Sequence, residues 1–143
     1  MKIAIVASRF SKFNAEIVDR LVEGATDALL KNGLKTEDIT LIRVPGAFEI
    51  PLAAQAAAVS KKFDGIIALG CVIRGETPHF EYFSRHASAG IGRVALDHNI
   101  PVAFGILTVD TEAQAAARAA PGNNKGAEAA MAAIEMVNLL KQL

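Results

Sequence analysis

The segment RGETPH (residues 74–79) places polar and ionisable residues directly after an apolar run of the chain. Threonine is a favoured N-cap and proline a favoured first helical residue, so Thr77 and Pro78 predict the start of a helix. The backbone N–H groups of Gly75, Glu76 and Thr77 would then lie beside the positive end of that helix and could bind an anion such as phosphate. A simple helix cap is the commoner use of such a pair, and this alternative stays open.

His79 falls in the first turn of the same predicted helix. The field at a helix N-terminus favours a neutral imidazole that can accept a proton, so His79 is a candidate for proton transfer. A half-exposed surface histidine is the alternative. Cys71, the only cysteine, could act as a nucleophile with His79, but a cysteine in an apolar strand is more commonly a buried packing residue.

Two further ionisable side chains lie near the ends of predicted elements. Glu49 precedes Pro51 at a predicted helix start, where the helix dipole alone favours a carboxylate. A capping role therefore explains Glu49 about as well as binding of a polyhydroxylated substrate does. Arg118 follows an Ala-rich segment with few acidic neighbours in sequence, which leaves its guanidinium available for a phosphate group, although most such arginines are simply solvated.

Metal and nucleotide motifs are absent from the sequence. His86 and His98 lack the i, i+4 histidine partner that a helical zinc pair needs. The sequence contains neither a GxGxxG pattern nor a GxxxxGK[ST] pattern. It therefore predicts no metal ligand set and no nucleotide-phosphate loop.

Four short apolar runs predict the strands that bring these residues together, and they span residues 2–7, 39–44, 65–73 and 101–109. They lack clean period-two alternation, which is typical of parallel strands covered on both faces. Helical segments lie between them, and this repeat predicts a three-layer α/β/α fold with a four-stranded parallel sheet. The polar segments that follow the strands would then share the carboxyl edge, where a small-molecule pocket is the default hypothesis.

Apolar residues spaced by three or four positions predict two amphipathic helices between the strands. One stripe contains Ile17, Leu21, Ala25 and Ala28, and the other contains Phe80, Phe83, Ala87, Ile91 and Val94. Asn32 and Gly33 predict a left-handed end for the first of these helices. Further helices are expected at residues 52–60, 111–120 and near 124–142, with a break at Pro121-Gly122.

Length and composition bound the class of protein. The 143 residues suit a single domain spanning residues 1–143. Equal numbers of basic and acidic side chains, 15 of each, leave no basic footprint for nucleic acid. No apolar stretch approaches the roughly 20 residues that a membrane-spanning helix needs, and the N-terminus lacks a signal-peptide pattern, so we expect a cytoplasmic protein without a membrane partner. Hydrophobic residues make up 52% of the chain, which suggests a surface buried against other copies.

Several longer motifs resemble the 6,7-dimethyl-8-ribityllumazine synthase family, which acts in riboflavin biosynthesis. They are VPGAFEIPLAA (44–54), ALGCVIRGETPHFEY (68–82), PVAFGILT (101–108) and NKGAEAA with AIEM (124–136), in the family's order and over nearly the whole chain. The resemblance implies a flavodoxin-like fold and a homo-oligomer, either a pentamer or an icosahedral shell of pentamers. Riboflavin synthase is then a candidate partner.

The resemblance also implies a reaction, the penultimate step of riboflavin synthesis. In it, 5-amino-6-(D-ribitylamino)pyrimidine-2,4-dione condenses with 3,4-dihydroxy-2-butanone 4-phosphate and releases phosphate and water, without metal or organic cofactor. The scheme needs no protein nucleophile. Orienting the two reactants supplies most of the rate enhancement, and proton transfer by His79 adds a smaller factor.

The family's roles carry over to matching positions of this chain. An aromatic residue near the end of the first strand stacks on the pyrimidine, and the spacing of FNAEIVDRLVEGA (13–25) favours Phe13, with Asn14 beside it, over Phe10. Ala47, Phe48 and Glu49 hold the ribityl chain, Cys71, Val72 and Ile73 line the ring site, and Gly75, Glu76, Thr77 and Arg118 bind phosphate. His79 transfers protons with support from Glu128, while Phe104, Arg118 and Lys125 match residues that an adjoining subunit contributes.

The sequence departs from the family pattern near residues 118–126, which are one residue shorter than the common form and can displace Lys125. The chain also begins almost at its first predicted strand, so the size of the assembly stays open. Two other classes of protein remain as alternatives. A flavodoxin-like carrier would bind a flavin or lumazine without forming product, and a structural shell subunit would tolerate loss of Glu49 and His79.

Overall fold

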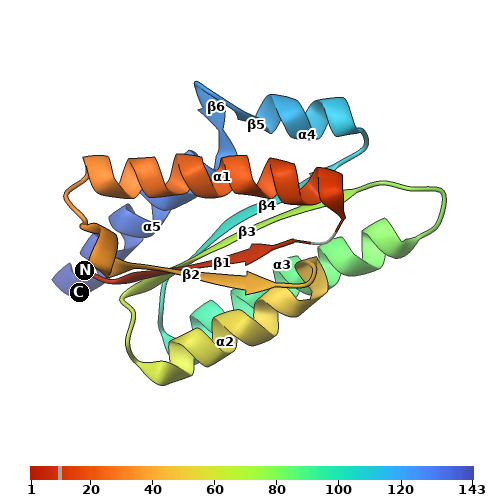
Figure 1. Cartoon of the computed structure of the whole chain (residues 1–143). Coiled ribbons are helices and arrows are strands. Elements are labelled where there is room, and N and C mark those ends of the chain that lie inside the picture. Colours follow the sequence, from red (N-terminus) through yellow and green to blue (C-terminus); the bar gives the residue numbers. More distant parts are fainter. Residues whose placement is uncertain (10) are drawn as a thin grey trace.

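The computed structural model describes residues 1–9 and 11–143, and its centre is a four-stranded parallel sheet (Figure 1). The strands are β1 (Ile3–Ser8), β2 (Ile39–Val44), β3 (Gly65–Ile73) and β4 (Val102–Val109), in the spatial order β2-β1-β3-β4. All neighbouring strands pair in parallel. The four apolar runs of the sequence are thereby confirmed as strands, each within one residue of its expected bounds.

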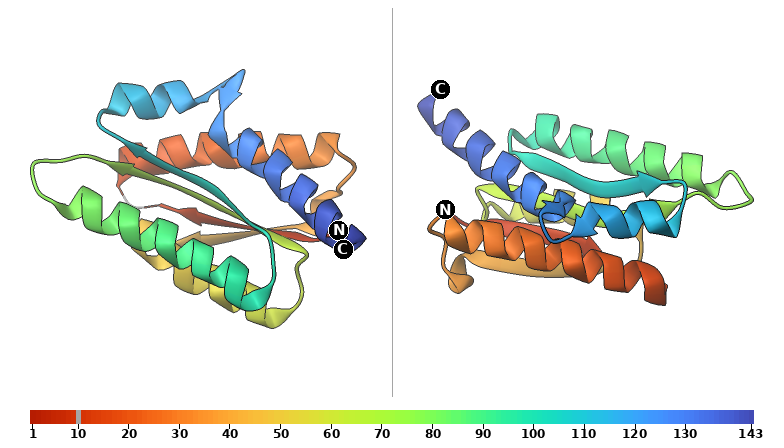
Figure 2. Two further views of the ribbon diagram at one scale, coloured as in Figure 1. Left: turned by 180° about the vertical axis from the view of Figure 1, so that it is seen from behind. Right: turned by 90° about the horizontal axis from the view of Figure 1, so that it is seen from above.

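Helices cover both faces of the sheet and give the molecule three layers (Figures 1 and 2). On one face lie α1 (Lys12–Lys31) and α5 (Lys125–Gln142), and on the other lie α2 (Ile50–Ser60) and α3 (His79–His98). This arrangement confirms the predicted flavodoxin-like α/β/α fold. The shorter elements are η1 (Thr36–Asp38), η2 (Ala47–Glu49), α4 (Glu112–Arg118), β5 (Ala119–Ala120) and β6 (Asn123–Asn124).

The pleat of the central strands divides the apolar core in two. Along β1, Ile3 and Ile5 join the cluster under α1 and α5, whereas Ala4 and Val6 join the cluster under α2 and α3. Every residue of β1 is buried, because helices cover both of its faces. The carboxyl ends of the central strands therefore form a closely packed platform for whatever side chains follow them.

The strand order creates a switch point beside β1. The chain passes from β1 to β2 on one side and then returns to β3 on the other side. In α/β sheets such a reversal opens a crevice beyond the carboxyl ends of the strands. These ends point to the right in Figure 1, where the loop between β3 and α3 extends past the sheet, and both chain termini lie at the opposite end.

Two glycines border α1 at positions that require a residue without a side chain. Gly33, at φ 96°, follows the helix in the left-handed conformation, which confirms the predicted end. Gly126 of α5 lies so close to α1 that an added Cβ would overlap the carbonyl oxygen of Leu21. The two helices can pack at this distance only because residue 126 has no side chain.

The start of α3 differs from the prediction. The helix begins at His79 with Pro78 as its N-cap, and no side chain caps it, so the expected N-cap role of Thr77 is wrong. Pro78 has ψ 8°, outside the helical range, and the first helical residue is therefore His79. His79 nevertheless lies in the first turn, as the sequence predicted.

The apolar stripe of α3 is confirmed only in part. Ala87, Ile91 and Val94 are buried against the sheet, but Phe83 is 39% exposed. The first turns of α3 extend beyond the carboxyl edge of the sheet (Figure 1), and Phe83 belongs to neither buried cluster.

The segment predicted as a helix at residues 111–120 ends earlier, because α4 stops at Arg118 and the chain turns back as the β5–β6 pair. Gly122, at φ 79°, lies in that turn and confirms the predicted break. Within residues 1–9 and 11–143, no helix has both the length and the apolar character needed to cross a membrane.

Candidate functional site

A cavity of about 620 Å³, called here the edge cavity, opens at the carboxyl edge of the sheet. Its walls come from the ends of β1 and β3, the turn after β2, the loop after β3 and the start of α3. The volume lies within the usual range for small-molecule sites. Among the predicted site residues, those that line it are Asn14, Ala47, Phe48, Glu49, Cys71, Val72, Ile73, Gly75, Thr77 and His79.

The turn from Gly46 to Glu49 forms one wall of the edge cavity. The Glu49 N–H donates to the Gly46 carbonyl at 3.2 Å, and the Gly46 N–H donates to Glu49 Oε2 at 3.1 Å. The carboxylate therefore closes its own turn with one lone pair and keeps further lone pairs as acceptors at an exposed position. Capping and ligand binding, which the sequence left as alternatives for Glu49, are compatible in this geometry.

The loop of Gly75, Glu76 and Thr77 joins β3 to α3. Gly75 and Thr77 line the edge cavity, whereas Glu76 does not. No backbone acceptor for the N–H groups of these three residues is found in the part of the chain that the structure describes. Free donors beside a helix N-terminus favour a bound anion, so the geometry suits a phosphate group.

Arg74 anchors the start of this loop. Its backbone N–H donates to the Val109 carbonyl at 2.8 Å, and its Nε donates to Asp110 Oδ1 at 2.8 Å. The guanidinium also lies 4.5 Å from the ring centre of Phe80 and 3.8 Å from Glu81 Oε1. Through these contacts the first residue of the loop is tied both to the end of β4 and to α3.

His79 is exposed at the edge cavity as the first residue of α3. Its imidazole stacks on the ring of Phe83, with ring centres 5.6 Å apart and an interplanar angle of 8°. Stacking uses the face of the imidazole and leaves its two nitrogens available for hydrogen bonds in the plane of the ring. The side chain can therefore exchange a proton with a molecule in the cavity.

The end of β3 is joined to α1 by a hydrogen bond. The amide Nδ2 of Asn14 donates to the carbonyl oxygen of Cys71 at 3.1 Å. Cys71 is 5% exposed, and burial raises the pKa of its thiol to about 11. At neutral pH the thiol is protonated and a poor nucleophile, which favours the packing role over the nucleophilic one.

A second cavity, of about 380 Å³, lies along β4 between the strand and α5, and we call it the β4 cavity. It is lined by four further predicted site residues, Phe104, Arg118, Lys125 and Glu128. Lys125 Nζ lies 2.9 Å from Glu128 Oε2, and Arg118 Nη1 donates to the Gln114 carbonyl at 3.0 Å. The edge cavity and the β4 cavity share no lining residue, so a single chain does not bring these groups to His79.

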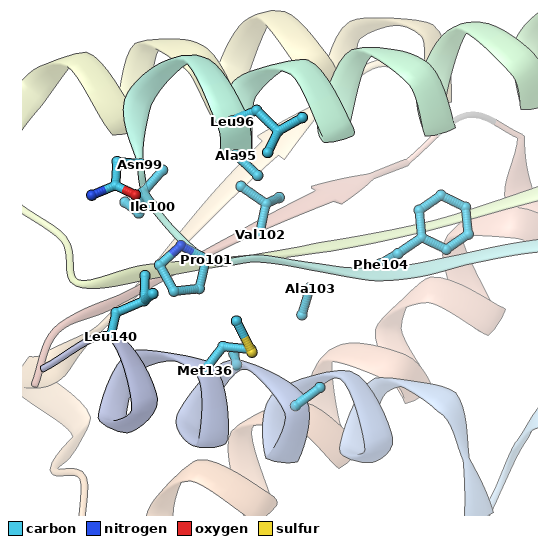
Figure 3. A pocket seen from close by; sticks show the side chains of 12 residues that line it. Ala95, Leu96, Asn99, Ile100, Pro101, Val102, Ala103, Phe104, Met136 and Leu140 are labelled. Carbon is cyan, nitrogen blue, oxygen red and sulfur yellow. The ribbon is translucent and has the colours of Figure 1, made fainter. Parts of the chain in front are cut away.

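An apolar groove of about 460 Å³ adjoins the β4 cavity at Phe104, which lines both (Figure 3). The groove has β4 as its floor and is flanked by α3 and α5. Leu96 on its rim is 85% exposed, and Phe104 is 47% exposed. Large apolar side chains left exposed together are typical of a surface that another protein covers.

Some predicted residues do not reach the edge cavity. Phe13, the favoured stacking residue, is half-buried against the apolar core on the α1 side and is not among the lining residues. Phe10, the other candidate, lies outside the described residues. The assignment of the stacking ring to either residue therefore stays a prediction.

Five other lining residues were not singled out as site residues by the sequence analysis. They are Ser8, Pro45, Gly46, Phe80 and Phe83. Phe80 and Phe83 were counted as core because their spacing continues the helical stripe. Ser8 ends β1 and is the kind of polar residue at a strand end that could have indicated the site.

The comparison with protein families gives one match over most of the chain. Residues 1–141 match the family model described as 6,7-dimethyl-8-ribityllumazine synthase. The chain is also similar to proteins named 6,7-dimethyl-8-ribityllumazine synthase from three strains of Campylobacter jejuni, 81-176, RM1221 and NCTC 11168. Each is 56% identical over 143 residues, and the match covers 99% of this chain and 91% of the relative.

Proposed function

The chain belongs to the 6,7-dimethyl-8-ribityllumazine synthase family, and on this premise we propose that the edge cavity is where its substrates meet. The enzyme condenses 5-amino-6-(D-ribitylamino)pyrimidine-2,4-dione with 3,4-dihydroxy-2-butanone 4-phosphate to 6,7-dimethyl-8-ribityllumazine, releasing phosphate and water. We treat residues 1–143 as one domain of this kind. The observation that carries the proposal is the meeting of Glu49, Thr77 and His79 in one cavity, although they come from distant parts of the chain.

The ribityl chain and the ring bind to different walls in this proposal. Ala47, Phe48 and Glu49 receive the ribityl hydroxyls, and the acceptor lone pairs of the Glu49 carboxylate support this role. The ring lies along Cys71, Val72 and Ile73 at the end of β3. Its stacking partner is Phe13 or Phe10, with Asn14 supporting the strand end.

The phosphate of the second substrate binds at the loop between β3 and α3. The N–H groups of Gly75, Glu76 and Thr77 point to this role because they lie beside the N-terminus of α3. The ketone of the bound substrate would then lie between this loop and the amine of the pyrimidine. Holding the two reactants in this way is worth up to roughly 7–11 kcal/mol of the activation barrier in favourable cases.

His79 moves protons during the reaction. The amine attacks the ketone, and a first water leaves as the imine forms. Phosphate is then eliminated, the resulting enol tautomerises to a ketone, and the ribitylamino nitrogen attacks this carbonyl and closes the second ring with loss of a second water. These steps need proton transfers to and from nitrogen and oxygen, which an exposed imidazole at the cavity can carry out. No covalent bond to the protein forms, in keeping with the protonated state of Cys71.

The active site is completed by a second copy of the chain. Phe104, Arg118, Lys125 and Glu128 lie together in the β4 cavity, away from His79 of the same chain. A neighbouring copy that places its β4 cavity against the edge cavity would supply cationic groups to the phosphate and Glu128 to His79. The exposed apolar groove beside the β4 cavity supports such an interface.

We infer the oligomeric state, the location and the partner of the protein from its membership of the family. We propose a homopentamer, alone or in an icosahedral shell, which acts in the cytoplasm without metal or organic cofactor and with riboflavin synthase as a partner. Within residues 1–9 and 11–143, no group of three or more His, Cys, Asp or Glu side chains could hold a metal ion.

One assay separates this function from the two alternatives. Purified protein is mixed with both substrates, and the absorbance and fluorescence of the lumazine are followed. The enzyme forms product, and the variants Glu49→Ala and His79→Ala form it more slowly. A carrier would bind the lumazine without forming it. A shell subunit would form no lumazine, and its Glu49→Ala and His79→Ala variants would assemble as well as the unaltered protein.

A further inference from the structure

Four aromatic rings form a continuous row along the start of α3. His79 stacks on Phe83 with ring centres 5.6 Å apart, and Phe83 lies 5.9 Å from Phe48 in a tilted arrangement. Phe48 in turn stacks on His86, with ring centres 4.0 Å apart and an interplanar angle of 17°. The row therefore joins the proton-transfer residue to the turn that holds Glu49.

The last ring of the row makes a second contact with the same turn. The Nε2 atom of His86 lies 3.1 Å from the carbonyl oxygen of Phe48, within hydrogen-bond distance. A carbonyl oxygen can only accept, so Nε2 carries the proton. The imidazole of His86 thus stacks on the ring of Phe48 and also donates to the backbone carbonyl of Phe48.

Packing of the core does not explain this row. Phe48 is 51% exposed and Phe83 is 39% exposed, and both belong to the wall of the edge cavity rather than to the buried clusters. His86 is exposed and does not line the cavity, so it does not touch a molecule bound there. The ring contact and the hydrogen bond of His86 are both with Phe48, so we expect its effect on the reaction to pass through Phe48.

We propose that His86 is a positioning residue that fixes the Phe48–Glu49 turn on α3 and so sets the affinity for the ribityl chain. This inference rests on the proposed function of the edge cavity. The turn closes on itself through Glu49 and Gly46, but those bonds do not fix its distance from α3. The bond from His86 joins the turn directly to α3, the helix that carries His79, and it adds to the packing of Ala47 in the buried cluster that contains Ala87.

The test separates the hydrogen bond from the stack. His86→Ala removes both, His86→Phe keeps a ring without the donor, and His86→Gln keeps a donor amide close to the position of Nε2 without the ring. His98→Gln, at the far end of α3 and outside the edge cavity, is the matched control. The dissociation constant of 6,7-dimethyl-8-ribityllumazine is measured by fluorescence titration, that of inorganic phosphate by isothermal titration calorimetry, and Tm by thermal unfolding.

We expect His86→Ala and His86→Phe to weaken lumazine binding by about 2- to 10-fold, which is the loss of one neutral hydrogen bond. His86→Gln should recover most of that affinity, while His98→Gln should leave it unchanged. Phosphate binding should stay as in the unaltered protein in all four variants. In turnover assays the KM for the pyrimidine should rise and kcat should change little.

Two results would overturn the inference. Either lumazine binds to His86→Ala as it does to the unaltered protein, or lumazine and phosphate affinities fall together with Tm, which would mark a general loosening of the fold. The proposed function fails separately, when the unaltered protein forms no lumazine from the two substrates. The titrations do not depend on turnover, so they decide the role of His86 in either case.

Discussion

Arg74 Nε donates to Asp110 Oδ1 at 2.8 Å, and this ion pair joins the end of β3 to the residue that follows β4. It also places the guanidinium at the start of the loop to which we assign phosphate binding. These contacts leave two roles for Arg74, of which we expect the first. It can hold the loop through Asp110, or it can turn away from Asp110 and bind the phosphate itself.

Asp110→Asn distinguishes the two roles of Arg74. If Arg74 holds the loop, loss of the carboxylate loosens the loop and raises the KM for the phosphate-bearing substrate by about 1.5- to 5-fold, as expected for an exposed pair. If Arg74 binds phosphate directly, freeing it lowers that KM. Steady-state kinetics with the other substrate saturating gives the answer, and Asp97→Asn, which breaks the Arg93–Asp97 pair on α3, is the control.

His79→Ala should slow turnover without abolishing it. Proton transfer contributes a limited factor, whereas the orientation of the two substrates by the cavity walls is retained. We expect kcat to fall by roughly 10²-fold and lumazine affinity to stay near that of the unaltered protein. An unchanged kcat would remove His79 from the mechanism.

Because of Cys71, the free energy of unfolding should fall as the pH rises in the alkaline range. Burial raises the pKa of the thiol from 9.0 to about 11, so the folded state keeps a proton that the unfolded state loses in this range. The contribution of Cys71 to the free energy of unfolding is full below pH 9 and declines as the pH rises toward 11. Urea unfolding at several pH values should show this decline, and Cys71→Ala should show less of it. Equal slopes in the two proteins would contradict the assignment.

Gly126→Ala should destabilise the protein, because a Cβ would overlap the carbonyl oxygen of Leu21 and force α1 and α5 apart. Overpacking of this kind costs about 1–3 kcal/mol. Gly92→Ala is the matched control, since Gly92 also lies in a helix and an added Cβ there meets nothing within 4 Å. That variant should gain up to about 1 kcal/mol from helix propensity. Chemical denaturation of both variants should give shifts of opposite sign.

The sheet was predictable from the sequence because burial on both faces leaves a direct signal. The apolar runs at residues 2–7 and 65–73 became β1 and β3, in which nearly every residue is buried. The signal for where helices begin and end was weaker. Thr77 and Pro78 fit a helix start by residue type, but the chain turns into the helix one residue later, which local propensities do not resolve.

The edge cavity was predictable in outline because parallel strands end at a common edge. Glu49, Thr77 and His79 meet there for that reason. The role of Phe83 was not predictable, since its spacing fits the buried stripe of α3 and only the three-dimensional fold shows that it lines the edge cavity. The partners of Arg74 and His86 were missed because both pairings join residues more than 30 positions apart.

The separation of His79 from Arg118 within one chain leads to the central claim, that two copies complete each active site. The most direct test is complementation between two impaired parents. His79→Ala and Arg118→Ala chains are unfolded, mixed and refolded together, and lumazine formation is compared with that of each parent refolded alone. The account predicts that the mixture is more active than either parent, because some interfaces then pair an intact edge cavity with an intact β4 cavity. A mixture no more active than the average of its parents would show that each chain works with its own residues alone.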